Sequence, residues 1–427
     1  MKFYIALIFF AGILIAQEGK KVETIAVNET FLPLITTQDS LQSIEYLKRD
    51  IDFIINRNSY ANTQYSIAVY SLDRREYLYT KNEERGLTPA SLTKLFTTFT
   101  SLSNMGDSSF VRTSIFCLDD NINDGEINSD LFIQGHGDAL FDVGDLDTLF
   151  KLIKNKGISK IDGNILIDQS FFDNINDRKA YSGDRDRVQN LAPITPFSVS
   201  RRPSLRASKY IRNVLTKNSI SFPGEISTCE LPDFADNIEI KLLAEFRRPL
   251  VDLIKITNKR SDNFVAEHLF KMNGAINNFS DIDAYSSQDL LLKTTSDFHI
   301  DFNDCVLNDG SGLSRRNKLT AKSIVDLLIK VDMLPYAPNY RSSLAIAGYD
   351  GTLKGRLKGT LAEKNLIGKT GTLRDASGLA GYVNTLDGER LAFAIIFNGN
   401  SGVRYYKQLE DELVQNLAGF FYFNVAN

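Results

Sequence analysis

The stretch Pro89-Ala90-Ser91-Leu92-Thr93-Lys94 decides how the chain is interpreted. Apolar residues at helical spacing follow and predict a helix that starts here: Leu92, Leu95, Phe96, Phe99 and Leu102. Residues three positions apart share a helix face, so Lys94 is expected one turn below Ser91 and partly buried. Burial and the positive end of the helix dipole both disfavour an ammonium there. A neutral lysine can take the proton of a serine hydroxyl and so activate it as a nucleophile.

Two further stretches accompany this one. Taken alone, Ser-x-x-Lys is more typical of a surface lysine one turn from a capping serine. Ser261-Asp262-Asn263, however, precedes an apolar run, residues 264–270, that suits a buried helix. Lys369-Thr370-Gly371-Thr372 lies in a predicted strand, residues 366–373, where the glycine would let a ligand backbone come close. The ordered trio favours one shared site over three chance matches.

Ser-x-x-Lys, Ser-x-Asn and Lys-Thr-Gly, in this order, are the signature of penicillin-binding proteins and serine β-lactamases. The chain more specifically resembles the D-alanyl-D-alanine carboxypeptidase/endopeptidase family of low-molecular-mass penicillin-binding proteins (peptidase family S13, penicillin-binding protein 4 type). Four further stretches carry the resemblance, which runs from about Ile51 to the end: residues 131–138, 309–315, 351–353 and 379–383.

The resemblance implies both a fold and a catalytic group. The fold is an α/β (α+β) serine β-lactamase/transpeptidase-like fold, with a central antiparallel sheet between helices and an inserted small α+β domain. Ser91 would be the nucleophile and Lys94 its base. Ser261 would pass the proton to the leaving amine, and Asn263 would hold the substrate amide.

The same resemblance implies a binding group on the strand. Lys369 would bind the terminal carboxylate of the substrate, and it would lower the pKa of its neighbours by like-charge repulsion. Thr370 and Thr372, on either side of Gly371, would donate hydroxyl groups to the substrate. The backbone N–H groups of Ser91 and Thr372 would form the oxyanion hole.

The implied function is a secreted, penicillin-sensitive serine D-Ala-D-Ala carboxypeptidase that acts on peptidoglycan peptides through an acyl-enzyme on Ser91. Endopeptidase activity is an open extension. One alternative is a β-lactamase, but the sequence does not reveal a base for its deacylating water. The other is a non-catalytic wall-binding protein, against which the intact motifs argue. The expected partners are peptidoglycan peptides and β-lactam inhibitors.

Composition excludes several other classes of protein. The formal net charge is −4 and the Lys and Arg residues are scattered, so no nucleic acid is expected as a partner. Three cysteines form no disulfide framework, and three histidines show no metal-binding spacing. We therefore expect neither a metal nor a cofactor. The sequence around Lys369 imitates a phosphate-binding loop, but Glu363 stands where that loop needs its first glycine.

The first sixteen residues predict a secretory signal peptide, because Lys2 precedes an apolar run, residues 3–16, that is short for a membrane span. An uncleaved anchor is the alternative. The protein is therefore expected to be secreted or periplasmic, with membrane contact only through this segment. An aromatic end, residues 420–423, is expected to pack on the sheet rather than on a membrane.

The pattern along the chain predicts the domain organisation. Residues 17–107 and 237–427 form the two parts of the transpeptidase-like domain, and residues 108–236 form one inserted α+β domain. Ser91 and Ser261 are only 261 − 91 = 170 residues apart, which is short for the two added domains usual in the family. Residues 171–187 are charged and aperiodic and are interpreted as a surface loop. The chain is expected to return to the main domain around residues 238–243.

The predicted elements follow from apolar periodicity. Predicted helices cover residues 38–56, 145–156, 208–218, 286–298, 320–333 and 403–419. Predicted strands cover residues 66–72, 76–80, 111–118, 131–134, 164–167, 380–384 and 391–398.

Overall fold

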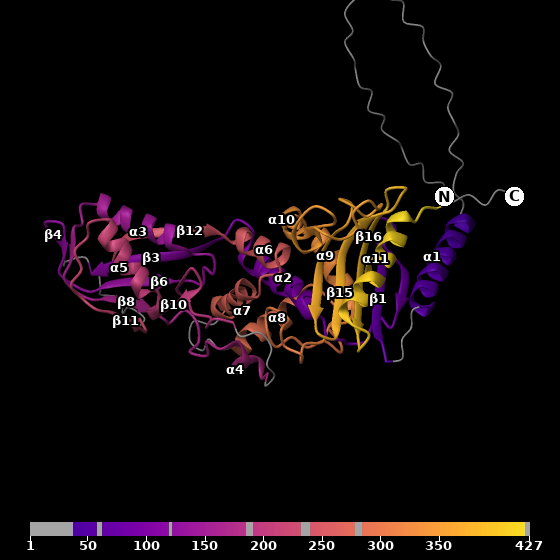
Figure 1. Cartoon of the computed structure of the whole chain (residues 1–427), viewed down its shortest axis with the longest axis horizontal. Helices are drawn as coiled ribbons and strands as arrows, with labels where there is room; N and C mark the ends of the chain where they lie inside the picture. The colour runs from indigo at the N-terminus through magenta and orange to yellow at the C-terminus, as the bar shows by residue number, and fades with distance from the viewer. Residues whose placement is uncertain are drawn as a thin grey trace, which may run out of the picture.

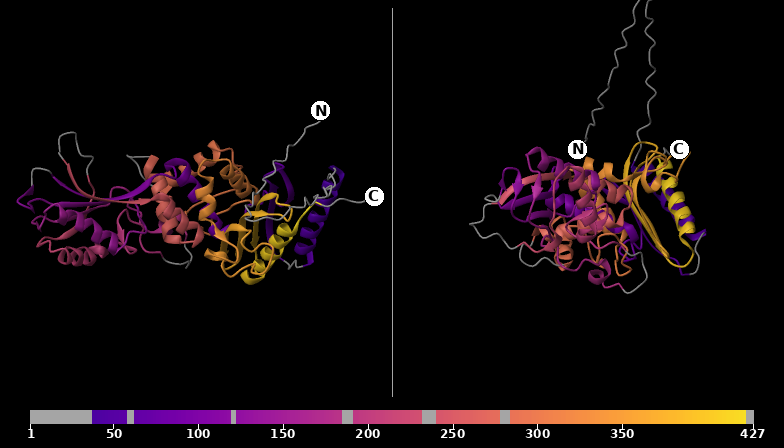
Figure 2. Two further views of the ribbon diagram at one scale, coloured as in Figure 1. Left: turned by 90° about the horizontal axis from the view of Figure 1, so that it is seen from above. Right: turned by 60° about the vertical axis from the view of Figure 1, so that its left-hand side comes forward.

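The computed structural model describes residues 37–57, 62–118, 122–184, 191–231, 240–277 and 284–422. The predicted signal segment lies outside these residues. Within them, no helix combines the length and apolar character that a membrane span requires. The molecule is elongated, with one sheet at each end and a layer of helices between them (Figure 1). Two further views show the same order (Figure 2).

The main sheet has six antiparallel strands in the order β13-β14-β15-β16-β1-β2. Their bounds are β1 Gln64–Ser71, β2 Glu76–Lys81, β13 Ala345–Ile346, β14 Ile367–Leu373, β15 Ala376–Asn384 and β16 Arg390–Asn398. The sheet is apolar on both sides, since β16 sends Phe393 and Ile395 to one core and Ala394 and Ile396 to the other. The predicted hairpin and the central antiparallel sheet are confirmed.

Two helices cover the outer face of this sheet: α1 Thr37–Arg57 and α11 Val403–Gly419. They lie on its right-hand side in Figure 1. Both were predicted, and the bounds of α11 are those expected. Phe420 and Tyr422 of the aromatic end join the same core, as expected, whereas Phe421 is exposed and Phe423 lies outside the described residues.

The inner face meets a layer of helices built around α2 Thr93–Met105. This layer also holds α6 Leu250–Lys259, α7 Asn263–Asn277, α8 Ala284–Asp297, α9 Ala321–Asp332 and α10 Ala337–Ser343. Every residue from Thr93 to Leu102 is buried, because α2 has neighbours on all sides. The 3₁₀ turn η1 Ala90–Leu92 precedes α2 and carries Ser91.

A second sheet of five strands, in the order β11-β8-β6-β3-β12, stands at the other end. Its strands are β3 Phe110–Leu118, β6 Leu131–Gly135, β8 Ile165–Asp168, β11 Ile226–Cys229 and β12 Ile240–Pro249. It shares one apolar core with α3 Val143–Asn155 and α5 Ser208–Lys217. The short strands β4 Ile122–Asn123, β5 Glu126–Ile127 and β7 Lys160–Ile161 form a small sheet, partly where only a polar turn was expected.

The second sheet extends beyond the boundary expected at residue 236. β12 pairs with β3 as far as Pro249, so the chain returns to the helical layer at Leu250 rather than around residues 238–243. Charged residues on β12, such as Glu245 and Arg247, make this strand difficult to recognise from the sequence pattern alone. The division into an inserted domain and a two-part main domain stays a prediction, with this boundary moved.

The main sheet and the turn that carries Ser91 approach each other closely. A Cβ atom on Gly371 would lie 2.5 Å from the carbonyl oxygen of Pro89, and one on Gly378 would lie 2.7 Å from Leu92 Cδ1. Glycine at these positions therefore makes room for η1. The expectation that Gly371 also lets a ligand backbone come close to the strand stays a prediction.

The Gly371→Ala variant should lose about 1–3 kcal/mol of unfolding free energy, because the added methyl group meets backbone that cannot move aside. Urea unfolding measures the loss. Gly355→Ala is the matched control, since a Cβ there meets no atom within 4 Å. Equal stability of the two variants would contradict the role assigned to Gly371.

Candidate functional site

The three predicted motifs meet where η1, the α6–α7 junction and β14 come together. Lys94 Nζ lies 2.9 Å from Ser91 Oγ and 2.7 Å from Asn263 Oδ1. Lys369 Nζ lies 2.8 Å from Ser261 Oγ. Because Ser261 and Asn263 are two residues apart, the two lysine contacts form one continuous cluster.

The Lys94 side chain is fully buried, more than the sequence suggested. Burial lowers its pKa to about 8, while the charges of Asp309, Glu267 and Asp262 oppose that shift. Its Nζ also contacts the carbonyl oxygen of Ser311. Of its three partners, only the Ser91 hydroxyl can donate a hydrogen, because the carbonyl oxygens of Asn263 and Ser311 can only accept. A neutral amine would use both N–H groups on these carbonyls, so its lone pair would face Ser91.

The second lysine is also buried. Lys369 Nζ donates to Ser261 Oγ and, at 2.7 Å, to the carbonyl oxygen of Thr370. Burial, and then the charge of Lys94, lower the pKa of Lys369 well below its usual value. The expected like-charge repulsion therefore acts on Lys369 itself. Thr370 Oγ1 lies 2.8 Å from Thr352 Oγ1, in the turn η4 Gly351–Leu353, and Thr372 is exposed on β14.

Two residues of the α6–α7 and η1 turns have unusual backbone conformations. Ser261 has φ +55° and Ala90 has φ +50°, a region that residues with side chains rarely adopt. Such conformations concentrate at functional sites. Nothing in the local sequence indicates them, since neither position is a glycine.

The loop formed by residues 309–314 closes the site from the α7 side. The Asp309 carboxylate accepts from the backbone N–H groups of Gly312 and Ser314 at 2.9 and 2.8 Å. A Cβ on Gly312 would lie 2.0 Å from the carbonyl oxygen of Ala90, so the loop rests directly on η1. The family resemblance alone had placed this loop near the site.

The interpretation of residues 171–187 as a surface loop is wrong for the part that the structure describes, residues 171–184. It contains α4 Arg178–Ser182, and the Arg178 side chain is only 2% exposed. Its NH1 atom lies 2.7 Å from Asp184 and 3.0 Å from Asp309. The charges of Arg178 and Asp184 are buried because they pair with each other and, through Arg178, with Asp309 of the site loop, a three-dimensional arrangement that periodicity cannot reveal.

The hairpin of β9 Ser198–Val199 and β10 Arg202–Pro203 also reaches the site. At its turn, Arg201 forms an ion pair with Asp262, the middle residue of the second motif. The Arg201 guanidinium carbon lies 5.4 Å from the centre of the Phe264 ring. No sequence signal pointed to this contact.

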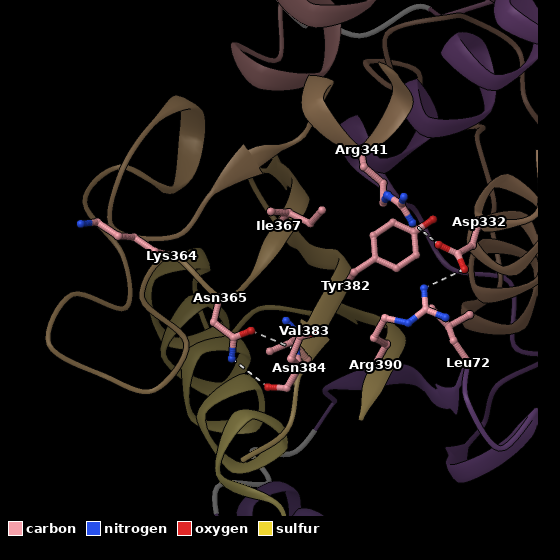
Figure 3. A pocket seen from close by; sticks show the side chains of 10 residues that line it. All are labelled: Leu72, Asp332, Arg341, Lys364, Asn365, Ile367, Tyr382, Val383, Asn384 and Arg390. Atoms are coloured by element: carbon pink, nitrogen blue, oxygen red, sulfur yellow. Dashed lines mark hydrogen bonds and ion pairs between the residues drawn. The ribbon is translucent and has the colours of Figure 1, made fainter. Parts of the chain in front are cut away.

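A hollow of about 420 Å³ near the start of β14 is separate from the motifs (Figure 3). Arg341 and Arg390 both pair with Asp332 there, and Arg390 also pairs with Asp73. In the figure, the Lys364 ammonium points away from these charges. No residue of the three motifs lines this hollow, and both of its arginines already pair with carboxylates.

An antiparallel sheet between helices, with a lysine buried beneath a serine at their junction, defines the serine β-lactamase/transpeptidase-like class. The family model for D-Ala-D-Ala carboxypeptidase 3 (S13) matches residues 47–201 and 188–419. The chain therefore belongs to this family of serine-type D-Ala-D-Ala carboxypeptidases.

Individual relatives agree with this assignment. The D-alanyl-D-alanine carboxypeptidase of Actinomadura sp. (strain R39) is 26% identical over 447 residues, which cover 83% of this chain and 81% of the relative. D-alanyl-D-alanine carboxypeptidase DacB of Haemophilus influenzae is 32% identical over 213 residues, 48% of this chain and 43% of the relative.

Solved structures show the same fold. Penicillin binding protein 4 (dacB) from Haemophilus influenzae superposes with a TM-score of 0.74 at 21% identity, covering 87% of this chain and 99% of that one. The peptidoglycan endopeptidase Bd3459 from Bdellovibrio bacteriovorus has a TM-score of 0.59 at 16% identity, covering 84% and 94%.

The Arg178→Ala variant should lose about 3–5 kcal/mol of unfolding free energy, because it leaves the carboxylates of Asp184 and Asp309 buried without their cation. Chemical denaturation measures the loss. Lys293→Ala removes an exposed ion pair, with Lys293 69% exposed, and should change stability by less than about 1 kcal/mol. A small effect of Arg178→Ala would show that the carboxylates reach solvent.

Proposed function

We propose that this protein is a secreted, penicillin-sensitive D-Ala-D-Ala carboxypeptidase that cleaves peptidoglycan peptides through an acyl-enzyme on Ser91. The observation that carries the proposal is the buried Lys94 amine, 2.9 Å from Ser91 Oγ, with two carbonyl acceptors fixing its other directions. The named activity of the relatives supports the substrate class. The apolar residues 3–16 after Lys2 support secretion.

In the proposed acylation, Lys94 takes the hydroxyl proton of Ser91 while Ser91 Oγ attacks the carbonyl carbon of the penultimate D-Ala. The N–H groups of Ser91 and Thr372 would stabilise the oxyanion. Ser261 then passes this proton from Lys94 on to the leaving amine and keeps its own hydroxyl, and the C–N bond breaks to release D-Ala. Water later hydrolyses the ester and restores the serine hydroxyl. A β-lactam reacts by the same first step, but its ring nitrogen stays attached.

Lys369 is the proposed anchor for the carboxylate at the end of the substrate. Burial keeps the pKa of Lys369 low in the unliganded protein. A bound carboxylate would raise that pKa, because an opposite charge favours the ammonium. Thr370, beside it on β14, would add a hydroxyl donor. This arrangement favours substrates with a free carboxyl end.

The central test is incubation with a peptide that ends in D-Ala-D-Ala, measuring released D-Ala with and without penicillin. The wild type should release D-Ala, penicillin should block release, and mass spectrometry should place the penicillin adduct on Ser91. Ser91→Ala should lose both activities. Lys94→Arg keeps the charge but supplies no base, so it should acylate far more slowly.

Other outcomes of this test identify the alternatives. Rapid turnover of penicillin without a stable adduct would favour a β-lactamase. An adduct on another residue would refute the site. Binding of peptidoglycan with no released product would favour a non-catalytic wall-binding protein. A crosslinked peptide as second substrate tests the endopeptidase extension.

Lys369→Ala should reduce cleavage of the free-acid peptide by at least about tenfold, the cost of roughly one charge-assisted contact. The same peptide with an amidated end lacks the carboxylate that Lys369 would bind. Comparing kcat/KM for the two peptides measures the effect. Equal losses on both would show that Lys369 acts on the chemistry rather than on the carboxylate.

A further inference from the structure

We propose that Glu267 is a positioning residue for Lys94: it anchors Ser311 through the backbone N–H group, the carbonyl of Ser311 orients the amine, and the charge of Glu267 helps to set the protonation of Lys94. Glu267 lies on α7, four residues after Asn263, so the two share a helix face. Asn263 contacts the amine directly, and Glu267 acts through the loop of residues 309–314. The inference rests on the proposed function.

The Glu267 carboxylate is fully buried and accepts three hydrogen bonds. Its Oε1 atom accepts from the backbone N–H of Ser311 at 2.8 Å, and Oε2 accepts from that of Gly310 at 3.2 Å. Tyr181, from α4, donates its hydroxyl to Oε2 at 2.6 Å. These N–H groups belong to the peptide units on either side of Gly310, so the carboxylate anchors the backbone that leads directly into Ser311 and its carbonyl.

The Ser311 carbonyl oxygen contacts both members of the catalytic pair. It accepts from Lys94 Nζ and also from Ser91 Oγ, the latter at 3.4 Å. If the Ser311 carbonyl rotated away, one Lys94 N–H group would be free to turn towards Ser91. The lone pair would then no longer face the hydroxyl proton. Orientation of the base therefore depends on a carboxylate that does not touch it.

Charge couples the two groups as well. Burial, followed by the charge of Asp309, raises the pKa of Glu267 to about 7. Near pH 8 the carboxylate is therefore largely ionised and favours the Lys94 ammonium. The charged or titratable groups around the pair come from every neighbouring element: Asp262 before α7, Lys271 on α7, Asp309 in the loop, Arg178 and Tyr181 on α4, and Lys369 on β14.

Glu267→Gln separates charge from anchoring, because its amide oxygen can still accept from the Ser311 N–H group. Loss of the negative charge should lower the pKa of Lys94. The rising limb of the acylation rate against pH should then move to lower pH by about half a unit, less than for a directly contacting pair. The measurement is the rate of Ser91 acylation by a fluorescent penicillin across neutral and alkaline pH.

Two further variants complete the experiment. Glu410→Gln also neutralises a buried glutamate, one that pairs with Arg356 on the far side of the main sheet, and should leave the limb in place. Tyr181→Phe keeps the ring beside Phe270 but removes the hydroxyl that stabilises the ionised carboxylate, so it should give a smaller shift in the same direction.

The results separate this inference from the function on which it rests. The rising limb of the acylation rate against pH could stay in place in both Glu267→Gln and Tyr181→Phe, or the rate could fall uniformly without a shift. Either result would show that Glu267 has a merely structural role and would overturn this inference alone. A wild type without an adduct on Ser91 would overturn the proposed function as well.

Discussion

The structure depends on one buried amine held by uncharged oxygens. The three oxygen atoms that contact Lys94 Nζ belong to a hydroxyl, an amide and a peptide group. A carboxylate in direct contact would hold the proton on the amine, and a solvated amine would keep its usual pKa. The carboxylates around Lys94 act only from a distance, so burial prevails and the pKa falls to about 8.

Placing that amine requires three separate elements to converge on the turn η1. The main sheet reaches the turn because Gly371 on β14 and Gly378 on β15 have no side chains, and the loop of residues 309–314 reaches it because Gly312 has none. The third element, α7, supplies Asn263 from its first turn. Larger residues at these glycines would push the sheet and the loop away and let water reach the amine.

The sequence predicted the parts of this arrangement that local patterns encode. Helical spacing after Ser91 predicted α2, and alternation predicted the hairpin of β1 and β2. The role of Glu267 was not visible, because a single glutamate on an apolar helix carries no pattern. Arg178 was misjudged for a related reason: a charged, aperiodic segment is typical of a surface loop unless its charges find partners elsewhere in the fold.

The contacts of Arg178, Tyr181 and Glu267, which the sequence did not reveal, all support the loop that carries Ser311. The Arg178 cation permits Asp309 to remain buried, and Asp309 shapes the loop that carries Ser311. Tyr181, from the same short helix, donates to Glu267, which holds the Ser311 N–H group. Since α4 lies in the segment between the first two motifs, part of that segment supports the site through the contacts of Arg178 and Tyr181. The chain between Ser91 and Ser261 therefore includes residues that support the base.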